Sequence, residues 1–419
     1  MQLTIFAAGS RGDIQPCVSL GQGLQRAGFA VRLAVPANFA AFVLEHGLGV
    51  HPLGGDVQQI MASDAGRQFM ERGSANPITS ISAMRTLLGP VALQMAEDAL
   101  TASHDAEALI SLAVLAPFAK SIAELRRIPL ILVEPTPLLP TGAFSAPGWP
   151  LQRDLGALPN RLSGVVMLQV LWQWYRPFVN GFRRQHGLPP FTGADFYHIL
   201  TATPLLGAYS PTVIPRPADW PDGARPTGYW FPDPPTTWRP SPALTAFLAK
   251  GSPPVYVGFG SMAGRRPEQL AQLVLEALAR SGQRGVLLTG WGGIQTVAVP
   301  DTVLVLDSVP HGWLFPQMAA VVHHGGAGTT GEGLRAGVPT VIVPFAVDQP
   351  FWGARVWALG VGPAPIPQHK LTAEALADAI TVAATHPGIR QRAAALGAIL
   401  RAEDGVANTV TLVKHYLKV

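Results

Sequence analysis

The stretch VVHHGGAGTTGEG at residues 321–333 combines residue types that can bind an anion. An apolar run ends in His323 and His324, a glycine-rich turn follows, and a helix is predicted to open at Thr329. Glycines let the backbone approach a ligand closely, and the first N–H groups of a helix favour negative charge. The stretch therefore predicts a diphosphate site, and the alternative is an ordinary tight turn between a strand and a helix.

The spacing of the glycines separates this site from two common nucleotide-binding motifs. Gly325, Gly326 and Gly328 do not match the dinucleotide fingerprint, and no lysine follows them as in a Walker loop. Hydride transfer and ATP hydrolysis are therefore disfavoured. The chain also has no Asp-Xaa-Asp pair that would hold Mg²⁺, so we expect backbone N–H groups, His324 and the helix end to stabilise the diphosphate without metal.

A second candidate is Asp13, in the turn GSRGDIQP at residues 9–16 that follows the first apolar run. Two interpretations stay open for its carboxylate. It caps the helix entered through Pro16, or it acts on a ligand as a base.

Apolar runs alternate with helical stretches, which is the pattern of parallel α/β domains. LTIFAA at 3–8 precedes a predicted helix over 16–27 and a second run at 30–35. The alternation restarts with PVYVGFGS at 254–261 and a helix over 267–281. We therefore expect an α/β fold of two Rossmann-like doubly wound domains, whose sheets turn their carboxyl ends toward a central cleft.

The domain boundaries follow from composition. Prolines crowd the segment before residue 254, which is typical of a linker. The predicted divisions are an N-terminal domain at 1–212, a proline-rich linker at 213–253, a C-terminal domain at 254–400 and a final helix at 401–419 that packs at the domain junction.

The composition excludes several classes of protein. Hydrophobic residues make up 48% of the 419 residues and charged residues 13%, which rules out a disordered polyelectrolyte. A formal net charge of +4 is too small an excess to indicate nucleic-acid binding.

Cysteine content and apolar segments bear on the compartment. The single cysteine, Cys17, excludes an intramolecular disulfide and fits a reducing compartment, and MQLTIFAAGS does not have the pattern of a signal peptide. We expect a cytoplasmic protein. The fourteen uncharged residues 162–175 favour a buried or interfacial helix over a membrane span, which leaves open a peripheral contact with the inner face of the membrane.

Residues 308–362 closely resemble the donor-binding region of inverting nucleotide-sugar glycosyltransferases of the UDP-glycosyltransferase (GT1) family, which have the two-domain GT-B fold. The turn at 9–16 matches the same group. The nearest resemblance is to sterol 3-β-glucosyltransferases and glycopeptide-antibiotic glucosyltransferases, and it covers essentially the whole chain. It implies UDP-glucose or another NDP-hexose as co-substrate, with no prosthetic group and no required metal.

The resemblance implies a set of donor-binding residues. His324 would contact the diphosphate, the following turn would hold it, Ser308 and Val309 would hold the nucleobase edge, and Asp348 with Gln349 would bind sugar hydroxyls. The full set is Ser10, Arg11, Gly12, Ser261, Trp291, Ser308, Val309, His324, Gly326, Gly328, Thr329, Thr330, Asp348 and Gln349.

The resemblance bears on two carboxylates, Asp13 and Glu332. Asp13 would be the general base that takes the proton of the acceptor hydroxyl. Glu332 falls where plant relatives keep a ribose-binding glutamate, and the alternative is a solvent-facing helix carboxylate.

The acceptor site is expected in the first domain, where aromatic residues and methionines are dense. The candidates are Met61, Phe144, Trp149, Trp172 and Tyr175. They suit an apolar acceptor such as a sterol, triterpenoid, polyketide or flavonoid.

The sequence thus predicts an inverting hexosyltransferase that acts on a hydroxyl of an apolar small molecule. One alternative is a rhamnosyl or deoxysugar transferase that uses a TDP-sugar on a lipid or antibiotic acceptor. Another, of a different class, is a sugar-nucleotide-binding protein without turnover. The acceptor, the regiochemistry and the oligomeric state are not predicted.

Overall fold

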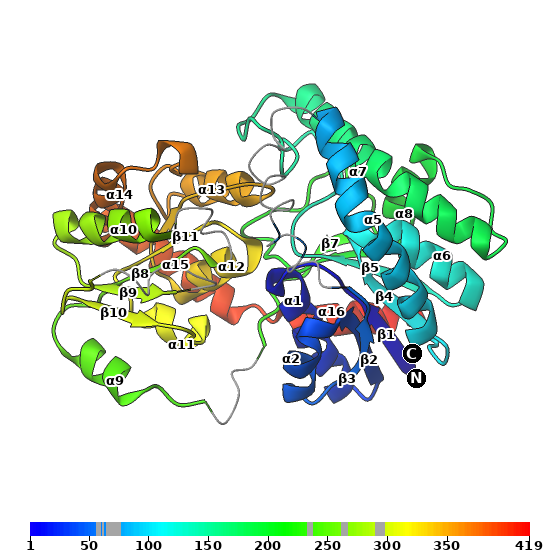
Figure 1. Cartoon of the computed structure of the whole chain (residues 1–419), viewed down its shortest axis with the longest axis horizontal. Coiled ribbons are helices and arrows are strands. Elements are labelled where there is room, and N and C mark those ends of the chain that lie inside the picture. Colours follow the sequence, from blue (N-terminus) through cyan, green and yellow to red (C-terminus); the bar gives the residue numbers. More distant parts are fainter. Residues whose placement is uncertain (56–59, 61–62, 64–76, 233–237, 261–266, 290–297) are drawn as a thin grey trace. The chain divides into compact units, whose positions relative to one another are not determined.

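The computed structural model describes the chain except residues 56–59, 61–62, 64–76, 233–237, 261–266 and 290–297. It divides into two compact units (Figure 1). The first comprises Met1–Asp233 with Asp404–Val419, and the second comprises Pro234–Glu403. Each is described by itself.

The first unit contains a parallel sheet of seven strands among its described residues, in the order β3-β2-β1-β4-β5-β6-β7. The strands are β1 Gln2–Phe6, β2 Ala30–Pro36, β3 Gly49–Leu53, β4 Ala108–Leu112, β5 Leu130–Glu134, β6 Leu205–Gly207 and β7 Ala224–Pro226. The helices are α1 Arg11–Arg26, α2 Ala40–Glu45, α5 Pro77–Ala102, α6 Ala116–Arg126, α7 Ala157–Gln185, α8 Gly193–Ala202 and α16 Gly405–Leu417.

Helices cover both faces of this sheet. Successive side chains of β1 point to opposite faces, so β1 contacts helices on both sides. Leu3 and Ile5 join one buried cluster with residues of α1 and with Val413 of α16. On the other face, the Thr4 hydroxyl donates to the carbonyl of Ala102 at the end of α5. Strands buried on both faces explain the continuous apolar runs of the sequence.

The second unit contains a five-stranded parallel sheet in the order β10-β9-β8-β11-β12. Its strands are β8 Val255–Gly258, β9 Gly285–Leu288, β10 Val303–Leu306, β11 Ala320–His323 and β12 Thr340–Ile342. Its helices are α9 Pro242–Ala249, α10 Pro267–Ser281, α11 His311–Leu314, α12 Ala327–Ala336, α13 Gln349–Ala358, α14 Ala373–Thr385 and α15 Pro387–Ala402. In β11, Val322 joins the cluster under α10 and α14, whereas Val321 joins the cluster of α9 and α11.

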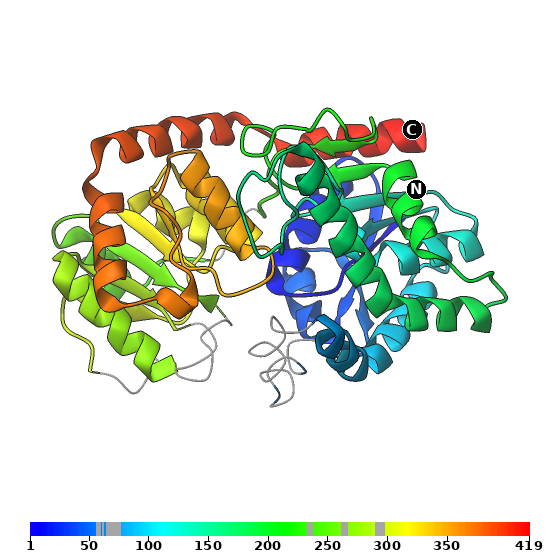
Figure 2. The ribbon, with the colours of Figure 1, turned by 90° about the horizontal axis from the view of Figure 1, so that it is seen from above.

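The last helix returns to the first unit (Figure 2). There α16 packs on α1, where a Cβ at Gly23 would lie 2.2 Å from Val406, so only glycine fits. The Thr409 hydroxyl donates to that of Thr227 at 2.8 Å. The segment 213–253, expected as a linker, contains β7 and α9, and the first unit extends to Asp233.

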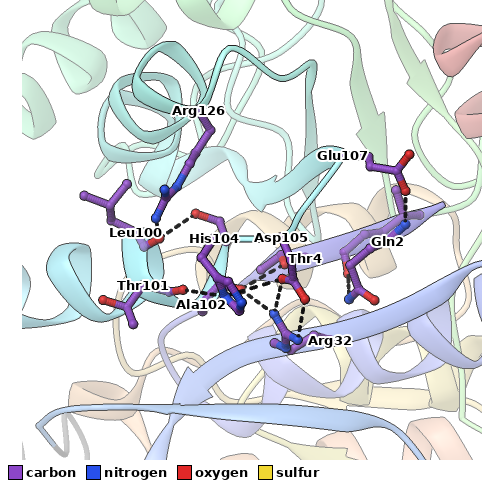
Figure 3. A network of polar contacts seen from close by, with 12 residues as sticks. Gln2, Thr4, Arg32, Leu100, Thr101, Ala102, His104, Asp105, Glu107 and Arg126 are labelled. Carbon is purple, nitrogen blue, oxygen red and sulfur yellow. Dashed lines mark hydrogen bonds and ion pairs between the residues drawn. The ribbon is translucent and has the colours of Figure 1, made fainter.

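A polar network holds the sheet of the first unit near the amino ends of its strands (Figure 3). The Arg32 guanidinium pairs with both carboxylate oxygens of Asp105, at 2.6 and 3.0 Å, and donates to the Ala102 carbonyl at 2.8 Å. The bond from Arg32 satisfies the Ala102 carbonyl at the end of α5. It lies near the amino ends of the strands, whereas the turn that carries Asp13 follows the carboxyl end of β1.

Within the described residues, no helix is both long enough and apolar enough to span a bilayer.

Candidate functional site

The turn between β11 and α12 has a backbone that only glycine can adopt at its centre. Gly325 has φ +95°, and a Cβ there would lie 2.7 Å from Ile342 and 3.1 Å from the carbonyl oxygen of Gln349. Its N–H donates to Nδ1 of His323 at 3.0 Å. The turn is therefore tied to the last residue of β11 and to the start of α13.

His324 projects a half-buried imidazole at this turn. Its Nδ1 is buried and makes no hydrogen bond within the described residues. A Cβ at Gly326 would lie 2.7 Å from its Nε2, which explains the glycine there. Burial lowers the pKa of His324 to about 4, so the ring is neutral at pH 7 and offers an uncharged N–H group.

The helix α12 opens beside His324. Its N-cap is Gly326, and a Cβ at Gly328 would meet no atom within 4 Å, so there is open space against this backbone. Thr329 is half-buried, whereas Thr330 is fully buried and its hydroxyl lacks a partner in the part of the chain that is described. The first turn of α12 with His324 can accept an anion through N–H groups.

Asp348 and Gln349, which follow β12, form hydrogen bonds with nearby residues of the chain through their side chains. Gln349 is buried, and its Oε1 accepts the N–H groups of Phe345 and Ala346 at 2.8 and 3.2 Å. Asp348 accepts the indole N–H of Trp352 at 3.0 Å. These contacts hold Asp348 and Gln349 at the start of α13, beside Gly325, in a loop where Val347 has φ +59° and is 70% exposed.

Glu332 is buried, which corrects the alternative of a solvent-facing carboxylate. Its side chain faces α11, because a Cβ at Gly312 would lie 3.6 Å from Oε2. Burial raises the pKa of Glu332 to about 7, although the charge of Arg335 opposes the shift. The helical position alone did not indicate which face of α12 meets α11.

The predicted nucleobase residues differ in exposure. Ser308 is exposed after β10, whereas the Val309 side chain packs in the cluster that contains Leu314 and Phe315. Phe315 stacks on His311, whose Nε2 hydrogen-bonds the Tyr256 hydroxyl at 3.1 Å. The residues Ser261, Trp291 and Met61, which were also predicted, lie outside the described residues.

In the first unit, Asp13 closes the turn that begins α1. Its Oδ2 accepts the N–H and the hydroxyl of Ser10 at 2.7 and 2.9 Å, which forms a capping box. A Cβ at Gly9 would lie 2.4 Å from the same oxygen. The helix therefore starts at Arg11 and not near Pro16, because this cap orders the first turn ahead of the proline. The cap is present, and the role of Asp13 as base stays a prediction.

The residues next to Asp13 in this turn make their own contacts. Arg11 lies over the ring of Phe42 at 4.8 Å and donates to Gln15, and Gly12 is exposed. Burial and, second, the charge of Asp13 raise the pKa of the Tyr175 hydroxyl. This places Tyr175 of α7 near the turn.

The predicted acceptor residues separate into two groups. Phe144 and Trp149 are half-buried, and Phe144 makes an edge contact with Trp220. Trp172 is only 2% exposed and packs on Phe196 of α8, and its assignment to the acceptor site stays a prediction. Tyr175 is also buried.

His323, whose Nδ1 accepts the N–H of Gly325, is a residue of the candidate site to which the sequence assigns no role. The two adjacent histidines at the end of a strand are a signal for such a residue. Because successive side chains of a strand point to opposite sides, His323 and His324 can be expected to have different contacts.

Comparisons with known proteins give the family to which this chain is related. Residues 3–134 match the glycosyltransferase family 28 N-terminal domain, and residues 283–410 match the erythromycin biosynthesis protein CIII-like C-terminal domain. A sterol 3-beta-glucosyltransferase of Arabidopsis thaliana is 36% identical over 100% of this chain and 68% of its own length. The O-mycaminosyltylonolide 6-deoxyallosyltransferase of Streptomyces fradiae is 36% identical over 99% of this chain and 97% of its own.

A solved structure carries the same fold. The glycosyltransferase of kitacinnamycin superposes with a TM-score of 0.73 at 21% identity, and the match covers 99% of this chain and 98% of that one. The two parallel-sheet α/β units are thus those of a GT-B fold.

Proposed function

Because the chain belongs to the GT-B glycosyltransferases of the GT1 family, we propose that it is an inverting enzyme that transfers glucose from UDP-glucose to a hydroxyl of an apolar small molecule. The observation that carries the proposal is the turn around His324, where a buried ring nitrogen that has no partner among the described residues lies beside the opening of α12. The relative named as a sterol 3-beta-glucosyltransferase supports a sterol-like acceptor and glucose.

The donor site would stabilise the leaving group of the reaction, which is the nucleoside diphosphate. The N–H groups at the start of α12 and the neutral imidazole of His324 would stabilise the charge that develops on the diphosphate. Asp348 and Gln349, at the start of α13, would bind sugar hydroxyls. No metal enters this proposal.

The attack by the acceptor hydroxyl requires a base. The Asp13 carboxylate would accept the proton of the acceptor hydroxyl as its oxygen forms a bond to the anomeric carbon. The bond from that carbon to the diphosphate breaks on the opposite face, and the nucleoside diphosphate leaves with the electron pair. The configuration at the anomeric carbon is therefore inverted.

A deoxysugar transferase that uses a TDP-sugar is the second candidate. It is favoured by the 36% identity to a protein named as a 6-deoxyallosyltransferase, which matches nearly the whole of both chains. The Arabidopsis relative has a further third of its length outside the match.

A donor-by-acceptor screen read by mass spectrometry tests the proposal. UDP-glucose, TDP-glucose and a TDP-deoxysugar are each paired with a sterol, a macrolide aglycone and a flavonoid, in buffer with and without EDTA. A hexose mass added to the sterol from UDP-glucose, unchanged by EDTA, supports the first candidate, and transfer only from the TDP-deoxysugar supports the second. Nucleotide binding without any transfer or donor hydrolysis would indicate a binding protein.

A further inference from the structure

The first turns of α7 present an unusual inward face. Asn160 and Ser163 are buried there because they hold the preceding loop: the Asn160 side chain accepts the N–H of Leu155 at 3.1 Å and donates to the Gly142 carbonyl at 3.1 Å. The Ser163 hydroxyl accepts the N–H of Ala146 at 2.8 Å. Polar side chains thus occupy the positions where a helix of this kind normally places apolar ones.

The outward face is apolar. Leu158, Leu162, Val165 and Val166 follow the i, i+4, i+7, i+8 pattern of a single helix face and are 70%, 52%, 37% and 45% exposed. Leu151, in the loop that these inward residues hold, is 52% exposed. We call these five residues the apolar face. The usual amphipathic arrangement is reversed, so solvent-facing positions carry the hydrophobic side chains.

Basic side chains border the apolar face. Between residues 135 and 185 the sequence has five arginines, no lysine and one acid, Asp154. Arg153, Arg161 and Arg176 are exposed, and Arg176 lies eighteen residues after Leu158, five helical turns along the same face. The acids close to this region are engaged within the protein: Asp154 accepts from Gly156 and Asn160, and Asp219, near Arg161, accepts from Thr141 and Gly142.

We propose that the apolar face docks on the surface of an anionic lipid bilayer. Leu158 and Leu162 would enter the boundary between headgroups and acyl chains, while Arg153, Arg161 and Arg176 would contact lipid phosphates. A bilayer accepts an apolar face with a cationic border without needing a complementary protein surface. The inference does not depend on the transfer reaction, because lipid binding is measured without donor or acceptor.

Vesicle cosedimentation of the full chain tests the proposal. Binding to vesicles of phosphatidylcholine mixed with phosphatidylglycerol is expected to exceed binding to phosphatidylcholine alone and to weaken with added salt. The double variant Leu158→Gln with Leu162→Gln should lower the partition coefficient by roughly a hundredfold, about tenfold for each leucine. Arg161→Gln should lower binding to the mixed vesicles and leave the weak binding to phosphatidylcholine unchanged.

The matched control is Leu44→Gln on α2, a leucine that is 58% exposed and lies outside the apolar face. It should bind as the wild type does, and circular dichroism shows that each variant is folded. Absent binding to the mixed vesicles, or equal binding by the double variant and the wild type, would overturn the proposal. Self-association of the wild type that the double variant loses, without vesicle binding, would also overturn it and assign the face to a second copy of the chain.

Discussion

The imidazole of His323 accepts the backbone N–H of Gly325 through Nδ1 at 3.0 Å, which joins the end of β11 to the turn of the candidate donor site. Because Nδ1 accepts, the neutral ring carries its proton on Nε2. Burial, with His324 and His311 nearby, holds the pKa of His323 well below its usual range. The ring therefore stays neutral and keeps accepting, and we expect His323 to act as a positioning residue for the candidate donor site.

Replacing His323 separates this role from simple packing. The Oδ1 of an asparagine can accept the same N–H two residues along the chain, whereas leucine cannot. We expect His323→Leu to weaken nucleoside diphosphate binding about tenfold, equivalent to ~1.4 kcal/mol, and His323→Asn to restore most of it. Isothermal titration with UDP measures both. Equal losses in the two variants would show that the hydrogen bond is not what matters.

Asp13→Asn tests the base. The amide keeps an oxygen that can accept from Ser10, so the cap and the start of α1 should survive, but it cannot take a proton. Transfer should fall by about 10²–10⁴-fold while UDP affinity changes little. Ser10→Ala is the control, since it removes one bond of the cap and leaves the carboxylate. If Asp13→Asn turns over at the wild-type rate, another group is the base.

The sequence predicted the features that are local in the chain. Gly325 is required by its positive φ, and Gly326 is required by the close approach of the His324 side chain. Both reasons are local, so the turn after β11 could be predicted without knowledge of the fold. Alternating apolar runs likewise predicted two parallel-sheet units.

Features that depend on distant contacts were not predictable. Glu332 is buried because α11 covers its face of α12, and Trp172 is core because α8 lies against it. Neither neighbour follows from helical periodicity. The predicted start of α1 near Pro16 is too late, because the Ser10–Asp13 cap orders the residues before the proline.

The Arg32–Asp105 pair should stabilise the first unit without affecting chemistry. The hydrogen bond from Arg32 lowers the pKa of Asp105, and a carboxylate with a lowered pKa contributes stability above its unfolded pKa that is lost as the pH falls. Arg32→Gln should cost about 1 kcal/mol at pH 7, since the pair is partly exposed and the Ala102 carbonyl loses one donor while it keeps the Thr4 hydroxyl.

Denaturant unfolding of Arg32→Gln at pH 7 and at pH 3 measures this contribution. The difference from the wild type should shrink at pH 3, and UDP affinity should be unchanged. Arg280→Gln, which breaks an exposed ion pair with Glu276 within α10, is the matched control and should cost no more than about 0.5 kcal/mol. A cost for Arg32→Gln as small as that of the control would contradict the role of the network.

Glu134 at the end of β5 should make stability depend on pH in the opposite direction. It is 3% exposed, and burial raises its pKa from 4.5 to about 7, although bonds from the Tyr209 hydroxyl at 2.6 Å and the Leu138 N–H at 3.1 Å oppose the shift. The folded chain then holds a proton that the unfolded chain has released. Stability is therefore greatest below pH 4.5 for this group and falls as the pH rises to about 7, by on the order of 3 kcal/mol.

Two variants distinguish the titration of Glu134 from that of other groups in the same pH range. Glu134→Gln can keep both contacts but cannot ionise, so the fall between pH 5 and pH 7 should diminish in urea unfolding curves, by about 3 kcal/mol at most. Tyr209→Phe removes the hydroxyl that favours the carboxylate, so the folded pKa of Glu134 should rise and the fall should extend to higher pH. If the fall in Tyr209→Phe instead ends at lower pH, the hydroxyl stabilises the protonated acid, and the assigned direction of its effect on the pKa of Glu134 is wrong.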